Sequence, residues 1–540
     1  MHGRTQRPAG LVAPAALVVL ALVVLAPGVP AATHRQRVAA MARPATVRAV
    51  EAASVEALAE VRLRRARVVA LRRLARTEAA LPAGRFPTVA ADGRWRTEGP
   101  WTGWLAGFHP GELWTAYELT GRPAWARLAV RRQRALAPRA ADTATHDLGF
   151  LLQTGFGRGV RLRGRTADAA VLDRAAGSLA SRWVPAAHAL RSWDGPPGEV
   201  TVIVDSLMNL ELLLAAADRA DARSDPAAAT WRGTALAHAA TVARVLVRPD
   251  GSTLHVARLD ERTGEVSWAG TVQGLRDSST WARGQSWAVH GFTTVWRESG
   301  DPAMLAAARA TARWAVTHLP ADGVPAWDSA AAAPRDASAA AVLASGLLEL
   351  ARLDPDPGLR AAWTRAGRRI LHALTGPAYL ATGHSTPALL RHVRHSPEHP
   401  DAGTSYADLY LLEAMQRDQL LPSQRPVLRV AGRRDPAPAT RVLDLGRVRA
   451  VSGVSVRWAA ATRRLAGPGD AVPAVRFRVD TSVDGRRWVR GRSAVSSGEW
   501  TGFETYDVRD RPARLVRLTL LGDGVSAAAV DAVRVRGQST

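Results

Sequence analysis

The spacing of apolar side chains changes once along this chain, close to Pro422. From about residue 46 to 421, Leu, Ala, Val and Trp recur every three or four residues, which is the period of helices that bury one face. After Pro422, apolar residues alternate instead with polar residues or arginine, as they do in half-buried strands. We therefore expect a helical domain at 46–421, a Pro- and Arg-rich linker at 422–438 and a β-rich module at 439–540.

Tryptophan is frequent in the segments between the expected helices. A buried indole needs a partner for its N–H group, and an exposed indole leaves apolar surface in water, so several loop tryptophans suggest a cleft that stacks on sugar rings. The expected helices are Val50 to Arg76, Glu112 to Leu119, Ala167 to Arg182, Asp205 to Arg219, Trp231 to Leu246, Trp281 to Arg297, Pro302 to His318, Ala337 to Arg352 and Leu359 to Leu374. The loops in question are Gly99 to Pro110, Ser192 to Gly198, Pro249 to Gly274 and Ala321 to Asp336.

The first residues have the features of a targeting sequence. Arg4 and Arg7 precede an apolar run from Leu11 to Leu25, and small residues follow it up to Ala32. We expect a signal peptide at 1–32 and a secreted or cell-surface protein, with no membrane span after cleavage. The alternative is that the segment stays as an anchor, although the run is short for a membrane span.

The chain is strongly basic and has no cysteine. Its formal net charge is +24, and all 72 of its Lys and Arg positions are arginine. A genome that favours arginine codons would explain this bias, and so would an anionic partner, because such a surface attracts polyanions. An acidic polysaccharide fits this charge as well as a nucleic acid does. The absence of cysteine excludes disulfides, thiol nucleophiles and Cys-ligated metals.

Two aspartates stand inside apolar runs and are the first candidates for acid–base chemistry. Asp147 lies in His146-Asp-Leu-Gly-Phe150, and Asp205 lies between Val202 and Leu210. Desolvation raises the pKa of a carboxyl group, and a second carboxylate nearby raises it further, so such a pair can hold a proton near neutral pH. The alternative for Asp205 is an N-cap of the helix that follows it.

A third group of candidates surrounds the expected helix start at Trp281. Trp281, Gln285 and Trp287 can face a cleft beside Arg283, where they would offer aromatic stacking, amide hydrogen bonds and a bidentate cation for a carboxylate. An acidic sugar needs this combination. The alternative is that both tryptophans belong to the core and Arg283 is a solvated surface charge.

These motifs resemble, in order, those of the unsaturated glucuronyl hydrolases, which form glycoside hydrolase family 88 and are related to the unsaturated rhamnogalacturonyl hydrolases. The resemblance implies an (α/α)6 barrel for residues 46–421. The β-rich module resembles discoidin-like, family 32-like carbohydrate-binding modules and is expected to be a β-sandwich that binds a polyanionic glycan or is purely structural. The motifs of the barrel are Trp104-Leu-Ala-Gly-Phe-His-Pro-Gly111, His146 to Phe150, Asp205 to Leu210, Asp250 to His255, Gln273-Gly274, Trp281 to Trp287 and Arg335 to Ala340; those of the module are Val442 to Gly446, Val479 to Trp488 and Ala513 to Thr519.

The resemblance also implies a reaction. In this family an acid that matches Asp205 protonates C4 of a 4,5-unsaturated uronic acid, and water then adds at C5 with the same residue as base. The resulting hemiketal rearranges and releases the next sugar. Asp147 matches a second essential acid, while His255, Gln273, Trp281, Arg283 and Trp287 match substrate-contacting positions, with Trp104 as a stacking wall. The partner that the resemblance implies is an acidic oligosaccharide, and no nucleic acid, metal or cofactor is implied.

Three points stay open in the sequence. The family's usual Gly-x-Tyr-x-x-Pro loop is replaced by the stretch from His392 to Pro397, so the preferred glycan and its sulfation are undetermined. His392, His395 and His399 have spacings that metal ligands use, but the nearby prolines favour a solvated loop. A non-catalytic polysaccharide-binding protein on the same fold is the alternative to the enzyme.

Overall fold

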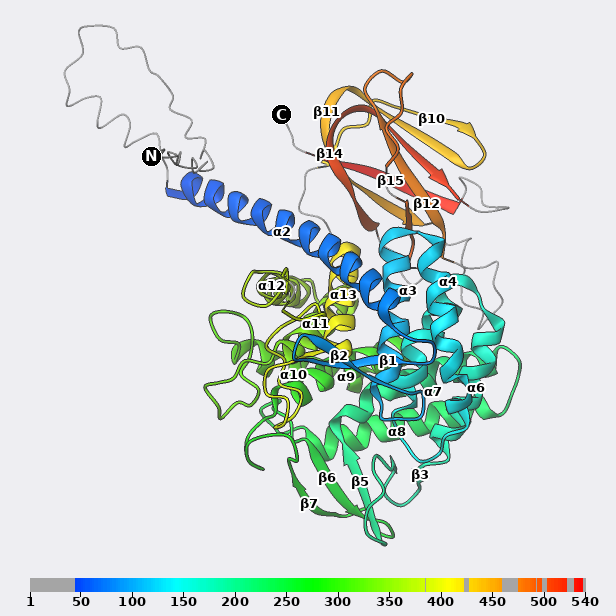
Figure 1. The fold of residues 1–540 in the computed structure, drawn as a ribbon, viewed down its shortest axis with the longest axis vertical. Helices are drawn as coiled ribbons and strands as arrows, with labels where there is room; N and C mark the ends of the chain where they lie inside the picture. Colours follow the sequence, from blue (N-terminus) through cyan, green and yellow to red (C-terminus); the bar gives the residue numbers. More distant parts are fainter. Residues whose placement is uncertain are drawn as a thin grey trace, which may run out of the picture. The chain divides into compact units, whose positions relative to one another are not determined.

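A computed structural model of the protein describes residues 44–383, 385–421, 427–458, 474–491, 493–497, 503–521 and 529–537 (Figure 1). The signal peptide expected at 1–32 lies outside these residues. Two compact units, Met1–Glu60 and Val61–Thr540, make up the chain, and helix α2 (Pro44–Ala80) begins in the first unit. In the described part of the chain, no helix has the length and apolarity that crossing a membrane requires. The second unit contains both the barrel helices and the C-terminal module.

Paired helices build the domain that precedes Pro422, which confirms the mainly α, α/α-barrel architecture. Helices α9, α11 and α13 are buried on nearly all sides, whereas α12 buries a single face, as an outer helix does. The helices are α3 (Phe108–Thr120), α4 (Pro123–Gln133), α5 (Arg158–Arg163), α6 (Thr166–Ala180), α7 (Leu210–Asp221), α8 (Ala227–Leu246), α9 (Ala282–Ser299), α10 (Pro302–Thr317), α11 (Ala337–Leu353), α12 (Pro357–Leu374) and α13 (Ser405–Leu420). The shorter turns of helix are η1 (Leu105–Gly107), η2 (Arg134–Ala141), η3 (Gly149–Gly157) and η4 (Val204–Asn209).

Two of these helices begin at an Asp-Pro pair, and the local chemistry explains why. The carboxylate of Asp301 accepts a hydrogen bond from the Ala303 N–H group at 2.8 Å, and Pro302 occupies the first helical position of α10. Asp356 accepts from the Leu359 N–H group in the same way, at 2.8 Å, at the start of α12. An N-cap carboxylate satisfies a free amide, and proline suits the first turn because it has no N–H group to satisfy.

Short strands in the loops of the barrel bring distant segments together. Strand β5 (Glu199–Ile203) pairs with β6 (Val256–Asp260), which pairs with β7 (Val266–Gly270). A second sheet joins β1 (Phe86–Ala91) to β2 (Arg94–Glu98) and to β8 (Gly403–Thr404), and β3 (Trp183–Val184) pairs with β4 (Ala189–Leu190). Because β5 ends beside the start of β6, the segment that carries Asp205 lies next to His255.

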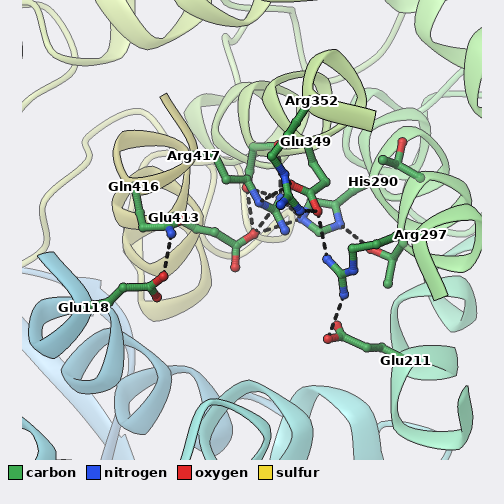
Figure 2. A network of polar contacts seen from close by, with 12 residues as sticks. Glu118, Glu211, His290, Arg297, Glu349, Arg352, Glu413, Gln416 and Arg417 are labelled. Carbon is green, nitrogen blue, oxygen red and sulfur yellow. Dashed lines mark hydrogen bonds and ion pairs between the residues drawn. The ribbon is translucent and has the colours of Figure 1, made fainter. Parts of the chain in front are cut away.

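A network of ion pairs connects the C-terminal parts of α9, α11 and α13 (Figure 2). Glu349 on α11 accepts hydrogen bonds from Arg297 at 3.0 Å and from Arg352 at 2.5 Å. Burial alone would raise the pKa of Glu349, but the charges of Arg352, Arg417 and Arg297 hold it well below its usual range. The network borders a cavity of about 850 Å³. Its charges satisfy one another, which a buried ion pair requires to avoid a large desolvation cost.

The described strands of the C-terminal module form one antiparallel sheet in the order β13-β12-β14-β11-β15-β9, with β10 on β11. The sheet encloses its own apolar cluster around Phe477 and Val454. Register shifts interrupt β11, and bulges of this kind bend a strand. The strands are β9 (Val427–Leu428), β10 (Gly432–Ala437), β11 (Thr440–Trp458), β12 (Arg476–Ser482), β13 (Ser493–Val495), β14 (Phe503–Leu520) and β15 (Val530–Gly537).

The stretch expected to be a linker, 422–438, contributes two strands to this sheet. Residues 422–426 lie outside the described residues, but β9 and β10 fall within the stretch. The proline and arginine content that suggested a linker is compatible with a strand because β10 pairs on one side only, with β11. Pro436 lies between Arg434 and Ala437, where the register with β11 shifts, and such irregularities of edge strands tolerate proline.

The module also packs directly against the barrel. Val495 of β13 belongs to a buried cluster with Leu113, Trp114 and Tyr117 of α3. Arg161 of α5 donates a hydrogen bond to the carbonyl of Ser497 at 2.8 Å. The two parts have separate cores, as the sequence indicates, but they share this interface and are not independent.

We predict that Val495→Ala lowers the free energy of unfolding by about 1–3 kcal/mol, because it removes buried methyl groups and leaves a cavity against α3. Val495 is 2% exposed, whereas Val483 in the same module is 49% exposed. Val483→Ala is therefore the control, and its thermal midpoint should stay within experimental error of the parent protein. Equal midpoints for the two variants, measured by circular dichroism, would contradict the interface.

Candidate active site

Asp205 lies in the first turn of η4, immediately after strand β5. Its side chain is 13% exposed, and Oδ2 is buried without a hydrogen-bond partner among the described residues. The alternative role as a helix cap is wrong, because Asn209 occupies the N-cap position of α7 and no side chain caps that helix. A carboxyl group that caps nothing and has an unsatisfied buried oxygen is available for chemistry.

Asp147 is held beside this turn by a close backbone approach. A side-chain carbon at Gly149 would lie 2.5 Å from the Asn209 Cα atom, so only glycine fits here. The Phe150 N–H group donates to Asn209 Oδ1 at 2.8 Å and fixes the contact. The Asp147 carboxylate itself contacts His146 Nε2 at 3.3 Å and accepts from Thr145 Oγ1 at 3.2 Å. The residues from Gly149 onward form a π-helix, a form that is often found at functional sites.

The hydrogen bonds of His255 determine which of its nitrogens carries the proton. Its Nδ1 atom accepts from the backbone N–H groups of Val272 at 3.2 Å and Gln273 at 3.3 Å. Burial and the charge of Arg283 lower the pKa of His255 to about 3, so the ring is neutral. The proton is therefore on Nε2, which lies 3.7 Å from Asp205 Oδ2. This N–H group has no partner of its own among the described residues and faces the same space as the carboxyl group.

The environment of Asp205 keeps it protonated near neutral pH. Burial raises its pKa to about 7, the charge of Arg283 opposes this, and the charge of Asp147 adds to it. A carboxyl group in this range can both donate and accept a proton at physiological pH, which general acid–base catalysis requires. The pair of aspartates that the sequence indicated is thus close enough to interact electrostatically.

Arg283 is buried, and both of its Nη atoms bind other groups of the protein. It is therefore not a solvated surface charge, and it does not offer a bidentate cation to a substrate carboxylate. Its Nη2 atom donates to Gln273 Oε1 at 3.0 Å, and its guanidinium lies 4.5 Å from the ring centre of Trp281. The other partners of its two Nη atoms are Asp336 Oδ2 (3.0 Å), Ser338 Oγ (3.3 Å) and the carbonyls of Arg394 (2.7 Å) and His395 (3.0 Å). Arg283 therefore organises the surrounding loops.

The three predicted tryptophans occupy different environments. Trp281 lies against His255, with ring centres 4.6 Å apart. Trp104 is half-buried and stacks on Tyr406 at 5.5 Å. Trp287 is completely buried among aromatic rings, and its Nε1 atom has no hydrogen-bond partner among the described residues. Its ring therefore belongs to the core, which was the alternative to a position in the cleft. Gln285 is also buried, where it donates to the carbonyls of Gly251 and Thr311, and does not face the site.

Several contacts were not singled out from the sequence. Trp193 is 37% exposed and meets the His255 ring edge-on, with ring centres 6.0 Å apart. Behind Asp205, the Leu190 N–H group donates to His238 Nδ1, so His238 Nε2–H donates to Ser206 Oγ at 2.7 Å. The sequence could have indicated Trp193, because it is one of the tryptophans in the loops. No feature of the sequence around His238 indicates its role.

The three histidines of the 392–399 stretch do not converge on a common point. His392 contacts Asp401 at 3.2 Å, and His395 Nδ1 contacts the Tyr406 hydroxyl at 3.3 Å. His395 and His399 stack with ring centres 6.4 Å apart. Within the described ranges, no group of three His, Cys, Asp or Glu side chains is arranged to hold a metal ion.

Comparison with known proteins identifies the class. No protein-family model matches the chain. It is 34% identical over 334 residues to the unsaturated glucuronyl hydrolase of Formosa agariphila, a match that covers 59% of this chain and 80% of that protein. A crystal structure of an unsaturated glucuronyl hydrolase specific for heparin superposes with a TM-score of 0.62 and 33% identity, over 66% of this chain and 97% of the other.

Another similar structure contains a ligand. It is a mutant of the Streptococcus agalactiae unsaturated glucuronyl hydrolase in complex with dGlcA-GalNAc6S, with a TM-score of 0.55 and 26% identity, over 66% of this chain and 90% of that one. The relatives share the α/α barrel of this chain and are glycoside hydrolases, a class to which two interacting carboxyl groups are suited. The chain belongs to the unsaturated glucuronyl hydrolases. This assignment favours the enzyme over a non-catalytic binding protein.

We predict that Asp205→Asn makes the protein more stable at pH 8 but not at pH 4. In the native protein the carboxyl group has a pKa of about 7, against about 3.9 in an unfolded chain. Between these values only the unfolded state loses the proton, so wild-type stability falls as pH rises, by about 4 kcal/mol in total. Below pH 4 the wild-type group is protonated in both states and this difference disappears.

The measurement is the thermal midpoint of both proteins at the two pH values. Asp173→Asn is the control, since Asp173 is held by Arg219 and Arg223 in ordinary ion pairs away from the site. A gain for Asp205→Asn that is the same at pH 4 and pH 8 would contradict the raised pKa.

Proposed function

We propose that this enzyme adds water across the 4,5-double bond of an unsaturated uronic acid at the end of an acidic oligosaccharide. Asp205 delivers a proton to C4, and water adds its oxygen at C5 while its proton returns to the Asp205 carboxylate. The product is a hemiketal at C5, whose ring opening exposes the anomeric carbon and releases the next sugar. One water is consumed, and the acid is regenerated in each cycle.

The buried carboxyl group of Asp205 is the observation that carries this proposal. Protonation of carbon needs an acid that still holds its proton at the working pH, and burial supplies this by raising the pKa of Asp205 to about 7. The same group must then accept a proton from water, which a carboxylate with that pKa can do. The charge of Asp147 raises the pKa of Asp205 and so favours the protonated form at the start of the cycle.

The neighbouring side chains have distinct roles in this scheme. His255 Nε2–H, which has no hydrogen-bond partner among the described residues and lies on the Asp205 side of the site, orients the attacking water or a uronate oxygen. Trp104 and Trp193, which are partly exposed, supply flat apolar surface for the sugar rings. Trp281 is buried, with His255 and Arg283 against its ring, and supports the site from behind. Arg283 holds Gln273 and the carbonyls of Arg394 and His395 in place. Arg283 therefore supports the site indirectly and does not bind the substrate through its own guanidinium group.

The substrate we propose is an unsaturated oligosaccharide of the kind that polysaccharide lyases leave from acidic polymers. The heparin-specific and dGlcA-GalNAc6S-bound relatives support this class, and the net charge of +24 suits an anionic substrate. We propose that the chain acts outside the cytoplasm after loss of residues 1–32. The domain boundaries, and a glycan-binding role for the C-terminal module, are proposals of the same kind.

We predict that Asp205→Asn abolishes turnover, with a loss of at least 10²–10⁴-fold, because the amide cannot deliver a proton to carbon. Activity is followed by the disappearance of the ultraviolet absorbance of the conjugated uronate in lyase-generated disaccharides, with and without sulfate. In the wild-type enzyme, kcat/KM should fall above about pH 7 as Asp205 ionises. Asp173→Asn is the control and should retain the wild-type rate. Near-wild-type turnover by Asp205→Asn would refute the assignment.

We predict that Asp147→Asn moves the alkaline limb of the pH profile to lower pH. Removing a negative charge near Asp205 lowers the pKa of Asp205, so the acid form is lost earlier as pH rises. The limb is read from kcat/KM measured across the neutral range for Asp147→Asn and for the remote variant Asp173→Asn. If the residual activity of Asp147→Asn has an unshifted limb, Asp147 does not influence the acid.

A further inference from the structure

A second concave site lies on the barrel away from the residues around Asp205. It is a pocket of about 410 Å³ between the last turns of α2, the β1–β2 hairpin and the loop at 383–387. Three arginines line it, Arg73, Arg76 and Arg94, together with Trp95 and Thr97. No carboxylate is among its lining residues in the described part of the chain. The pocket is therefore positively charged.

Arg73 places a buried positive charge at the floor of this pocket. Arg73 is 8% exposed. The backbone carbonyls of Gly383, Thr386 and Ala388 accept its hydrogen bonds, the last at 3.2 Å. Burial lowers the pKa of Arg73; the charge of Asp408 opposes this and the charge of Arg76 adds to it. Its hydrogen bonds are to neutral carbonyls, so its charge is not cancelled within the pocket. An anion that entered would be attracted to it.

The exposed arginines continue from the pocket along α2. Arg65, Arg72 and Arg76 are seven and four residues apart, so they lie on one face of the helix with spacings of about 10 Å and 6 Å. None of the three has an ion pair with a described residue, and the same holds for Arg94. Many arginines of the barrel interior are instead paired with carboxylates, as in the network around Glu349.

Trp95 gives the pocket a flat apolar wall. The ring is half-buried, and its Nε1 atom donates to Thr77 Oγ1 at 3.1 Å, which fixes the orientation of the indole. An aromatic ring beside arginine side chains is suited to a sugar that carries carboxylate or sulfate groups. The ring packs on the apolar face of the sugar, and each guanidinium group can donate two hydrogen bonds to the anionic oxygens.

We propose that Arg72, Arg76 and Arg94, with Trp95, form a binding site for an acidic polysaccharide chain that is separate from the active site. The choice of a polysaccharide as the polyanion rests on the proposed function. The positive charge of the pocket and of the adjoining arginines of α2, which together form the groove, does not depend on that function. A flat membrane surface cannot enter the pocket to reach Arg73 and Trp95. A chain held along α2 would keep the enzyme on the polymer whose lyase products it consumes.

The test is the affinity of the full chain for immobilised heparin, measured over a range of NaCl concentrations. The triple variant Arg72→Gln/Arg76→Gln/Arg94→Gln should bind at least tenfold more weakly and elute at lower salt. The slope of log affinity against log salt should become shallower by roughly one for each arginine that contacts the polymer. The three side chains are exposed, so the variant should fold and unfold like the wild type.

The matched control is Arg127→Gln/Arg134→Gln/Arg174→Gln. These arginines are also exposed, without ion pairs to described residues, and the control loses the same net charge. Equal loss of heparin affinity in the two variants would overturn the proposal, because net charge alone would then explain binding. The proposal would also be overturned if the groove variant lost as much affinity for double-stranded DNA or for anionic phosphatidylserine vesicles as it loses for heparin.

Turnover of an unsaturated disaccharide separates this site from the proposed function. The groove variant should turn over the disaccharide at the wild-type rate, because no residue of the groove is among those around Asp205. A groove variant that keeps heparin affinity but loses disaccharide turnover would overturn the separate site while leaving the proposed reaction in place. An inactive wild-type enzyme that still shows the groove-dependent affinity would overturn the reaction alone.

Discussion

Removal of water from one carboxyl group is the constraint on which the rest of the site depends. Asp205 can hold its proton near pH 7 only if the protein replaces the solvent around it without supplying a strong counter-charge at contact distance. Arg283 is near enough to lower the pKa of Asp205, but its Nη atoms are bound to Asp336, Gln273 and two carbonyls. The same arrangement leaves His255 neutral with its proton on the side of Asp205.

Arginine has three different roles in the described part of the protein. In the network around Glu349 the guanidinium groups neutralise buried carboxylates and hold helices together. Near Asp205 a single guanidinium is engaged by neutral acceptors and one carboxylate, so that its influence on the acid is partial. On α2, Arg65, Arg72 and Arg76 face solvent without ion pairs to described residues, so their charge is available to a ligand. The high arginine content thus serves packing, electrostatics and surface charge in different places.

Much of the site could be predicted from the sequence because its motifs lie in short, ordered runs. Aspartates flanked by apolar residues predict desolvation, and the structure brings Asp147 and Asp205 close enough to interact. The partners of Arg283 could not be predicted in this way, since two of them are backbone carbonyls more than 100 residues further along the chain. Trp287 shows the same limit, because periodicity does not distinguish a ring in the core from one that lines a cleft. The strands at 427–437 were missed because a one-sided edge strand tolerates the composition of a linker.

The contact between Val495 and α3 has a consequence for the order in which the protein is made. Helix α3 ends at Thr120, so the ribosome must add about 375 further residues before Val495 exists to cover its outer face. At bacterial or eukaryotic rates of synthesis this takes roughly 20–75 s. During that time Leu113 and Trp114 lack part of their final apolar cover, and the nascent barrel has an exposed patch that a chaperone could occupy. The barrel cannot finish folding as it is translated; its last surface is completed only when the C-terminal module arrives.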